Sequence, residues 1–174
     1  MIKNFKQTNT KETVLYNKIL SLSRNKLLYT KCMIDDSFQN RINLIFLHIS
    51  FLFIKIKVGT NGEIYKEFYQ KMFDLIFNNI EINMREIGYG DVTVNKKMKL
   101  LLRIFYNILL KCEIYNEQNH DSKSSFLKQH LSLKSGLKIN NNDELVKYFD
   151  KYQTFCIDLT PDSVLKGELN FKYN

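Results

Sequence analysis

Residues 42–54 most constrain the fold, because they are almost wholly apolar yet carry polar side chains at regular intervals. At about 100° per residue of a helix, the polar side chains fall into two narrow stripes on nearly opposite sides: Arg41, His48 and Lys55 in one, and Asn43, Ser50 and Lys57 in the other. Two apolar arcs separate the stripes. One contains Ile42, Ile45, Phe46, Ile49, Phe53 and Ile56, and the other contains Leu44, Leu47, Phe51, Ile54 and Val58.

A helix that is apolar on two sides needs two partners. We therefore predict a central helix, capped by Ser37 and ending near Val58, that neighbouring helices bury on both sides. The alternative is that one arc stays partly open as a groove for an apolar guest. The segment spans 13 residues between Arg41 and Lys55, well short of the roughly 20 that a membrane-spanning helix needs, so we interpret it as a core helix.

The other apolar residues also recur at helical spacing. We predict further helices over residues 11–28, 63–87, 94–115, 124–133 and 142–157, and a short helical or irregular tail from Pro161. The fold class expected is all-α: a single compact multi-helix domain over residues 13–172, preceded by a flexible segment over residues 1–12.

The charge balance indicates contact with polyanions. The chain of 174 residues carries a net charge of +8, which favours nucleic acid, ribosomal RNA or an anionic membrane surface. Only four of the 26 cations are arginines, so bidentate base recognition is disfavoured and DNA is not an expected partner. The lysine excess is equally explained by an A/T-rich genome.

The cysteines and the N-terminus suggest the compartment. Cys32, Cys112 and Cys156 are widely spaced and form no C-x-x-C pair, as in proteins of reducing compartments. Residues 1–13 lack the apolar stretch of a secretory signal and the arginine pattern of a mitochondrial presequence. We therefore expect a cytoplasmic protein.

Catalytic motifs are missing from the sequence, which has no G-x-S-x-G elbow, no phosphate-binding glycine loop and no H-E-x-x-H. His48 has no carboxylate, cysteine or histidine three or four residues away, so we expect it to make hydrogen bonds in or beside the core. We predict no catalytic residue, no cofactor and no metal site.

The segment around residues 85–99 joins two long predicted helices and is unusual in composition. The apolar side of the first helix is interrupted by Asn79, Asn83 and Glu86, and such breaks are expected at functional sites or where a helix leaves the core. Gly88 would supply a left-handed cap, and Gly90 completes the connector. Asp91 would organise this connector through Arg85 or Lys97, and Tyr89, held out between the glycines, would be available to an apolar guest.

Lys96, Lys97 and Lys99 are expected in the first two turns of the next helix, where the helix dipole disfavours cations. Lys96, Lys99 and Arg103 share one face. This face is either simply solvated or a docking ridge for an anionic surface.

A family resemblance extends over residues 13–171. The residues that carry it are Arg24 with Tyr29, Asp35-Asp36, Arg41 with His48, the blocks 84–91 and 94–99, Phe105-Tyr106, Tyr115, and Leu165-Lys166-Gly167 with Phe171. With them the chain resembles bacterial-type members of the ubiquinol-cytochrome c chaperone family. It departs from the family pattern in lacking a proline soon after Arg24, and in having Asn107-Ile108 where the family has Gly-Arg.

The resemblance implies a non-enzymatic, all-α assembly factor that binds newly made cytochrome b until it enters the cytochrome bc1 complex, respiratory complex III. It also implies a small partner protein and action near the ribosome tunnel exit. The location would be the cytoplasm, peripheral to the inner membrane, or the matrix side in a mitochondrion. The alternative hypothesis is a basic helical module that binds ribosomes or RNA and whose apolar residues are all core.

Overall fold

The computed structural model describes residues 10–134 and 141–173, and these residues are mainly helical. The helices are α1 (Lys11–Ser23), α2 (Lys26–Thr30), α3 (Phe38–Gly59), α4 (Gly62–Glu86), α5 (Asp91–Glu113), the 3-10 turn η1 (Tyr115–Glu117), α6 (His120–His130), α7 (Asn141–Asp158) and α8 (Pro161–Leu165). Within the described ranges the only β pairing is an isolated bridge between Ile34 and Leu133. The all-α prediction is confirmed. Most of the N-terminal segment predicted to be flexible lies outside the described residues, and its last two residues begin α1.

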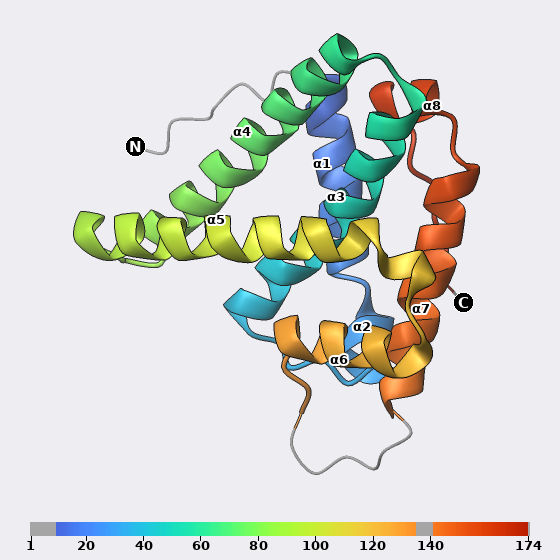
Figure 1. Cartoon of the computed structure of the whole chain (residues 1–174). Helices are drawn as coiled ribbons and strands as arrows, with labels where there is room; N and C mark the ends of the chain where they lie inside the picture. Colours follow the sequence, from blue (N-terminus) through green and yellow to red (C-terminus); the bar gives the residue numbers. More distant parts are fainter. Residues whose placement is uncertain (1–9, 135–140, 174) are drawn as a thin grey trace.

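Helix α3 is the central element, as predicted, and it contacts α1, α4, α5, α7 and α8 (Figure 1). Every residue from 42 to 53 is buried. The centre of the Phe46 ring lies 5.5 Å from that of Phe77 on α4 and 5.2 Å from that of Phe105 on α5. Helices α4 and α5 therefore both pack on this side chain. The length argument from the sequence was wrong, because α3 spans 22 residues and is long and apolar enough to cross a membrane. Its interpretation as a core helix still agrees with the structure, since 72% of its most apolar stretch is buried within the protein.

The middle residues of the two polar stripes of α3, Asn43, His48 and Ser50, are buried, whereas the charged residues at the ends of the stripes reach the surface. The Ser37 side chain caps the helix by accepting from the Asn40 amide. Asn43 Nδ2 donates to the His130 carbonyl at 2.5 Å, and Ser50 Oγ donates to the Phe46 carbonyl at 2.7 Å. Buried polar groups with partners avoid most of the desolvation cost, which is why a helix this apolar tolerates them.

One predicted helix, over residues 11–28, is in fact two. Helix α1 ends at Ser23, and the Arg24 amide bonds back to the Leu20 carbonyl. Asn25 Oδ1 then accepts from the Leu27 amide at 3.0 Å and starts α2. Asparagine competes with helix continuation because its side chain satisfies a free backbone N–H, and this local capping outweighed the apolar periodicity.

Helix α5 begins at Asp91, three residues before the predicted start. Lys96 and Lys97 therefore lie in the second turn and Lys99 in the third, whereas the helix dipole acts mainly within the first turn. The helix dipole therefore does not disfavour these lysines, contrary to the prediction, because the first turn carries the acidic Asp91 instead.

Candidate functional site

Helices α4 and α5 meet at a corner that projects from the rest of the molecule (Figure 1). The chain turns there through Gly88, whose φ is +99°. The Gly88 amide bonds to the Arg85 carbonyl at 3.0 Å and the Tyr89 amide to the Met84 carbonyl at 3.1 Å, the paired bonds of a Schellman cap. Gly90 has an ordinary φ of −71° and acts as the N-cap of α5, so only Gly88 is needed for backbone conformation.

Ion pairs hold the corner together. The Arg85 guanidinium bonds to Asp91 and, at 2.9 Å, to Glu81, as predicted for Arg85. Lys97 does not reach Asp91. Instead, its ammonium lies 5.0 Å from the centre of the Tyr89 ring, a cation–π distance. Tyr89 is 36% exposed, and its neighbours Ile87 and Val92 are 59% and 84% exposed, so the corner presents apolar surface.

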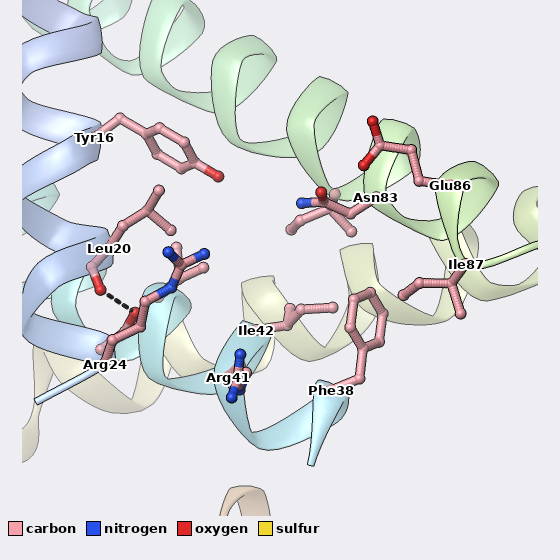
Figure 2. Close-up of a pocket in the computed structure, with 12 residues that line it drawn as sticks. Tyr16, Leu20, Arg24, Phe38, Arg41, Ile42, Asn83, Glu86 and Ile87 are labelled. Atoms are coloured by element: carbon pink, nitrogen blue, oxygen red, sulfur yellow. Dashed lines mark hydrogen bonds between the residues drawn. The ribbon is translucent and has the colours of Figure 1, made fainter. Parts of the chain in front are cut away.

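A pocket of about 290 Å³ opens where α1, the start of α3 and the end of α4 diverge (Figure 2). About half of its lining is apolar: Leu20, Phe38, Ile42, Ile45, Ile80 and Ile87. Ile87 also belongs to the corner, so the pocket and the corner are continuous. Two of the residues that interrupt the apolar side of α4, Asn83 and Glu86, line this pocket, whereas Asn79 bonds back to the Leu75 carbonyl at 2.7 Å.

Polar groups from three helices border the pocket. Figure 2 shows the Tyr16 hydroxyl and the Arg24 guanidinium on one side, with Asn83 and Glu86 across from them. No carboxylate among the described residues forms an ion pair with Arg24. Burial raises the pKa of Tyr16, and nearby Arg24 partly offsets this, so the Tyr16 hydroxyl stays neutral and can donate a hydrogen bond.

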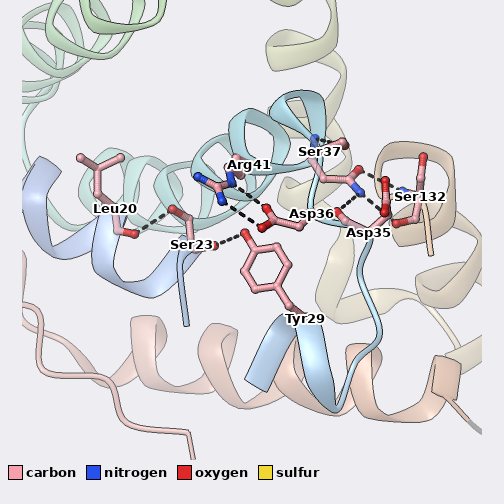
Figure 3. A network of polar contacts seen from close by, with 9 residues as sticks. Leu20, Ser23, Tyr29, Asp35, Asp36, Ser37, Arg41 and Ser132 are labelled. Carbon is pink, nitrogen blue, oxygen red and sulfur yellow. Dashed lines mark hydrogen bonds and ion pairs between the residues drawn. The ribbon is translucent and has the colours of Figure 1, made fainter. Parts of the chain in front are cut away.

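Arg41 also lines the pocket, and its guanidinium is held in place by Asp36 (Figure 3). Its Nε and Nη2 atoms donate to the two Asp36 oxygens at 2.7 and 2.9 Å. This bidentate pair lowers the pKa of Asp36. Beside it, the Tyr29 hydroxyl donates to the Ser23 carbonyl at 2.7 Å, so the segment between α1 and α3 is tied to the pocket rim.

His48 lies away from these surfaces, in the core between α3 and α7. Its Nδ1 contacts the Leu44 carbonyl at 2.6 Å and its Nε2 contacts the Tyr148 hydroxyl at 2.7 Å. A carbonyl can only accept, so Nδ1 carries the proton and Nε2 accepts from Tyr148. Burial lowers the pKa of His48 to about 4. The predicted hydrogen-bonding role of His48 agrees with this geometry.

The predicted cations form a separate surface. Lys96, Lys99 and Arg103 are exposed on the outer face of α5, whereas the pocket is lined by α1, α3 and α4. Apart from His48 in the core, the predicted residues thus form two groups, one at the corner and pocket and one along α5.

A second hollow, of about 270 Å³, lies between the last turns of α3, the end of α5, and α7. Its lining includes Phe51, Ile54 and Val58 from the second apolar arc of α3, and Val58 is 82% exposed. The helix is therefore buried on both sides along most of its length, and the second apolar arc is open to solvent only at its end. A guest in this opening remains a prediction.

The contributions of α1 to the pocket were missed by sequence reasoning. Tyr16 and Leu20 sit at ordinary helical spacing and carry no signal of a site. The interrupted pattern of α4 and the resemblance residues Arg24 and Arg41 were the signals for this region. Within the described part of the chain, no group of three or more His, Cys, Asp or Glu side chains is placed to hold a metal ion.

Comparisons with known proteins give a consistent picture. The family model described as ubiquinol-cytochrome C chaperone matches residues 30–171. The crystal structure of the Cbp3 homolog from Brucella abortus superposes with a TM-score of 0.77 and 21% sequence identity, covering 94% of this chain and 89% of that one. A search of curated proteins finds no significant match.

Proposed function

The chain belongs to the ubiquinol-cytochrome C chaperone family, and on that premise we propose that it is a non-enzymatic assembly chaperone for the cytochrome bc1 complex. Its guest is newly made cytochrome b, which it holds until assembly. We place it in the cytoplasm, peripheral to the inner membrane, with a small partner protein and the ribosome tunnel exit as further contacts.

The observation that carries this proposal is the continuous apolar surface from the pocket to the corner. Ile87 lines the pocket and is 59% exposed, and Tyr89 and Val92 extend the same corner. Apolar side chains interspersed with hydrogen-bonding groups in this way suit a guest segment that carries both apolar and polar side chains. Arg24, Tyr16 and Asn83 would offer hydrogen bonds to the backbone or polar side chains of that segment.

The chemistry of the buried groups supports holding rather than reaction. Burial raises the pKa of the Cys32 thiol to about 11 and that of Cys156 to about 12, and a thiol that stays protonated is a poor nucleophile. His48 has both ring nitrogens engaged inside the core.

Site-specific photo-crosslinking in the native cell tests the guest and its site together. A photoreactive phenylalanine analogue at Ile87 or Tyr89 should crosslink to cytochrome b, and the same analogue at Lys66, exposed at the other end of α4, should not. Crosslinks to cytochrome b from Lys66 alone would place the guest-binding site at the other end of α4. Crosslinks from Ile87 and Tyr89 to ribosomal components only would favour the alternative, a ribosome-binding module. The exposed cations of α5 are the observation that supports this alternative.

A further inference from the structure

The outer face of α5 carries a regular stripe of exposed residues. Its seven residues are Val92, Lys96, Lys99, Arg103, Tyr106, Leu110 and the C-cap residue Ile114. Because successive members are three or four positions apart, they all lie on one side of the helix. We call these seven residues the α5 stripe. It lies opposite the buried face of α5, which packs on α3 and α4.

The apolar members of the α5 stripe are unusually open to solvent. Val92 is 84% exposed, Leu110 64%, Tyr106 48% and Ile114 45%. Single exposed apolar residues are common on soluble proteins. Tyr106, Leu110 and Ile114 lie in successive turns and form a continuous patch, whereas Val92 lies at the other end of the stripe, beyond the three cations. Contiguous apolar patches of this kind mark interaction surfaces.

The charge on the α5 stripe has one sign. Lys96, Lys99 and Arg103 are exposed, and none of them forms an ion pair with any carboxylate of the described residues. The acidic residues of α5 lie off the stripe and are already paired: Asp91 with Arg85, and Glu113 with Lys57 at 2.7 Å. The stripe therefore offers three unneutralised cations beside an apolar patch.

We propose that the α5 stripe docks this protein on the surface of an anionic lipid bilayer. Lipid headgroups complement the cations, and the apolar side chains enter the boundary between headgroups and acyl chains, where tyrosine is favoured. RNA would complement only the cations and would leave Leu110 and Ile114 in water. The proposal rests on the membrane location proposed above but not on the guest, because the pocket is lined by residues of α1, α3 and the end of α4. Of the α5 stripe, Val92 alone also belongs to the corner.

Binding of the purified full chain to vesicles tests this proposal. Vesicles of phosphatidylcholine with phosphatidylglycerol should bind the protein, and vesicles of phosphatidylcholine alone should bind it much more weakly. Each cation near an anionic surface raises the partition coefficient about 5-fold, so Lys99→Gln with Arg103→Gln should lower it about 30-fold. Leu110→Gln should lower it about 10-fold, because a mostly exposed leucine no longer inserts.

Matched controls separate the α5 stripe from general charge and hydrophobicity. Lys66→Gln with Lys128→Gln removes two exposed cations from α4 and α6, and Ile157→Gln changes a 52% exposed apolar residue on α7. These variants should bind like the parent. All variants should keep the parent melting temperature, since each replaced side chain is exposed.

Three results would overturn the proposal: equal binding to neutral and anionic vesicles, an equal loss in the control variants, or full binding by Leu110→Gln together with loss in the cation variant. The last result would describe a purely electrostatic contact, as with ribosomal RNA.

Discussion

His48 should make the stability of the protein depend on pH between about 7 and 5. The imidazole is fully buried and neutral, with Nδ1 donating to the Leu44 carbonyl and Nε2 accepting from Tyr148. Protonating Nε2 would bury a charge and remove the acceptor that Tyr148 uses. Aromatic rings, including that of Tyr152 at 4.7 Å, surround the imidazole and offer no counter-charge.

The magnitude follows from the pKa. Burial lowers the pKa of His48 from 6.5 to about 4. Because the folded pKa lies below the unfolded one, the unfolded chain binds the proton first, and stability falls as the pH drops from 6.5 to 4. At 1.36 kcal/mol per pKa unit the whole window is worth about 3 kcal/mol, of which about 2 kcal/mol is lost by pH 5.

Urea unfolding measured between pH 7.5 and pH 5 checks this prediction. Burial also lowers the pKa of His130, so the comparison is best made in a His130→Gln background. Adding His48→Gln should flatten the pH dependence by about 2 kcal/mol, whatever its effect on stability at neutral pH. The same pH dependence with and without His48 would refute the reasoning.

Three further stability predictions concern single sites and can be read from thermal or urea unfolding. Phe46→Ala should cost about 3–5 kcal/mol because its ring is buried against two helices, and a loss below about 1 kcal/mol would contradict a packed core. Gly88→Ala should cost about 1–2 kcal/mol because φ is +99°. Gly90→Ala should cost only about 0.5 kcal/mol, because its φ of −71° suits alanine and only the N-cap preference of glycine is lost, and equal effects would contradict the cap geometry. Tyr148→Phe should cost about 1–3 kcal/mol by leaving Nε2 of His48 unpaired, and no loss would mean that this hydrogen bond is absent.

Much of the fold could be predicted because it is encoded locally. The two apolar arcs, the Ser37 cap and Gly88 each specify structure within one or two helical turns. The break at Asn25 was predictable in principle, because asparagine is a strong N-cap, but the apolar periodicity continued across it. Asp91 similarly marks the first turn of α5, but the helix was predicted to begin only at residue 94.

The site was harder to predict because it depends on tertiary contacts. The pocket brings Tyr16 and Arg24 beside Asn83 and Glu86, and nothing in the spacing of these residues indicates that they meet. The partner of His48, Tyr148, is 100 residues away. The interrupted apolar face of α4, the Gly88 cap with the Arg85–Asp91 contact, and the shared face of the cations on α5 were visible in the sequence, because each depends on residues close together in the chain.

The most direct test of the account is the bc1 content of cells that lack this protein. If it is an assembly chaperone, deletion should leave cytochrome b to be degraded and should lower the amount of assembled bc1 complex, measured by haem spectra and native gels. Tyr89→Ala or Asp91→Ala in a folded protein should partly reproduce the loss, and Lys66→Ala should not. Normal cytochrome b and bc1 content in the deletion strain would contradict the chaperone function itself.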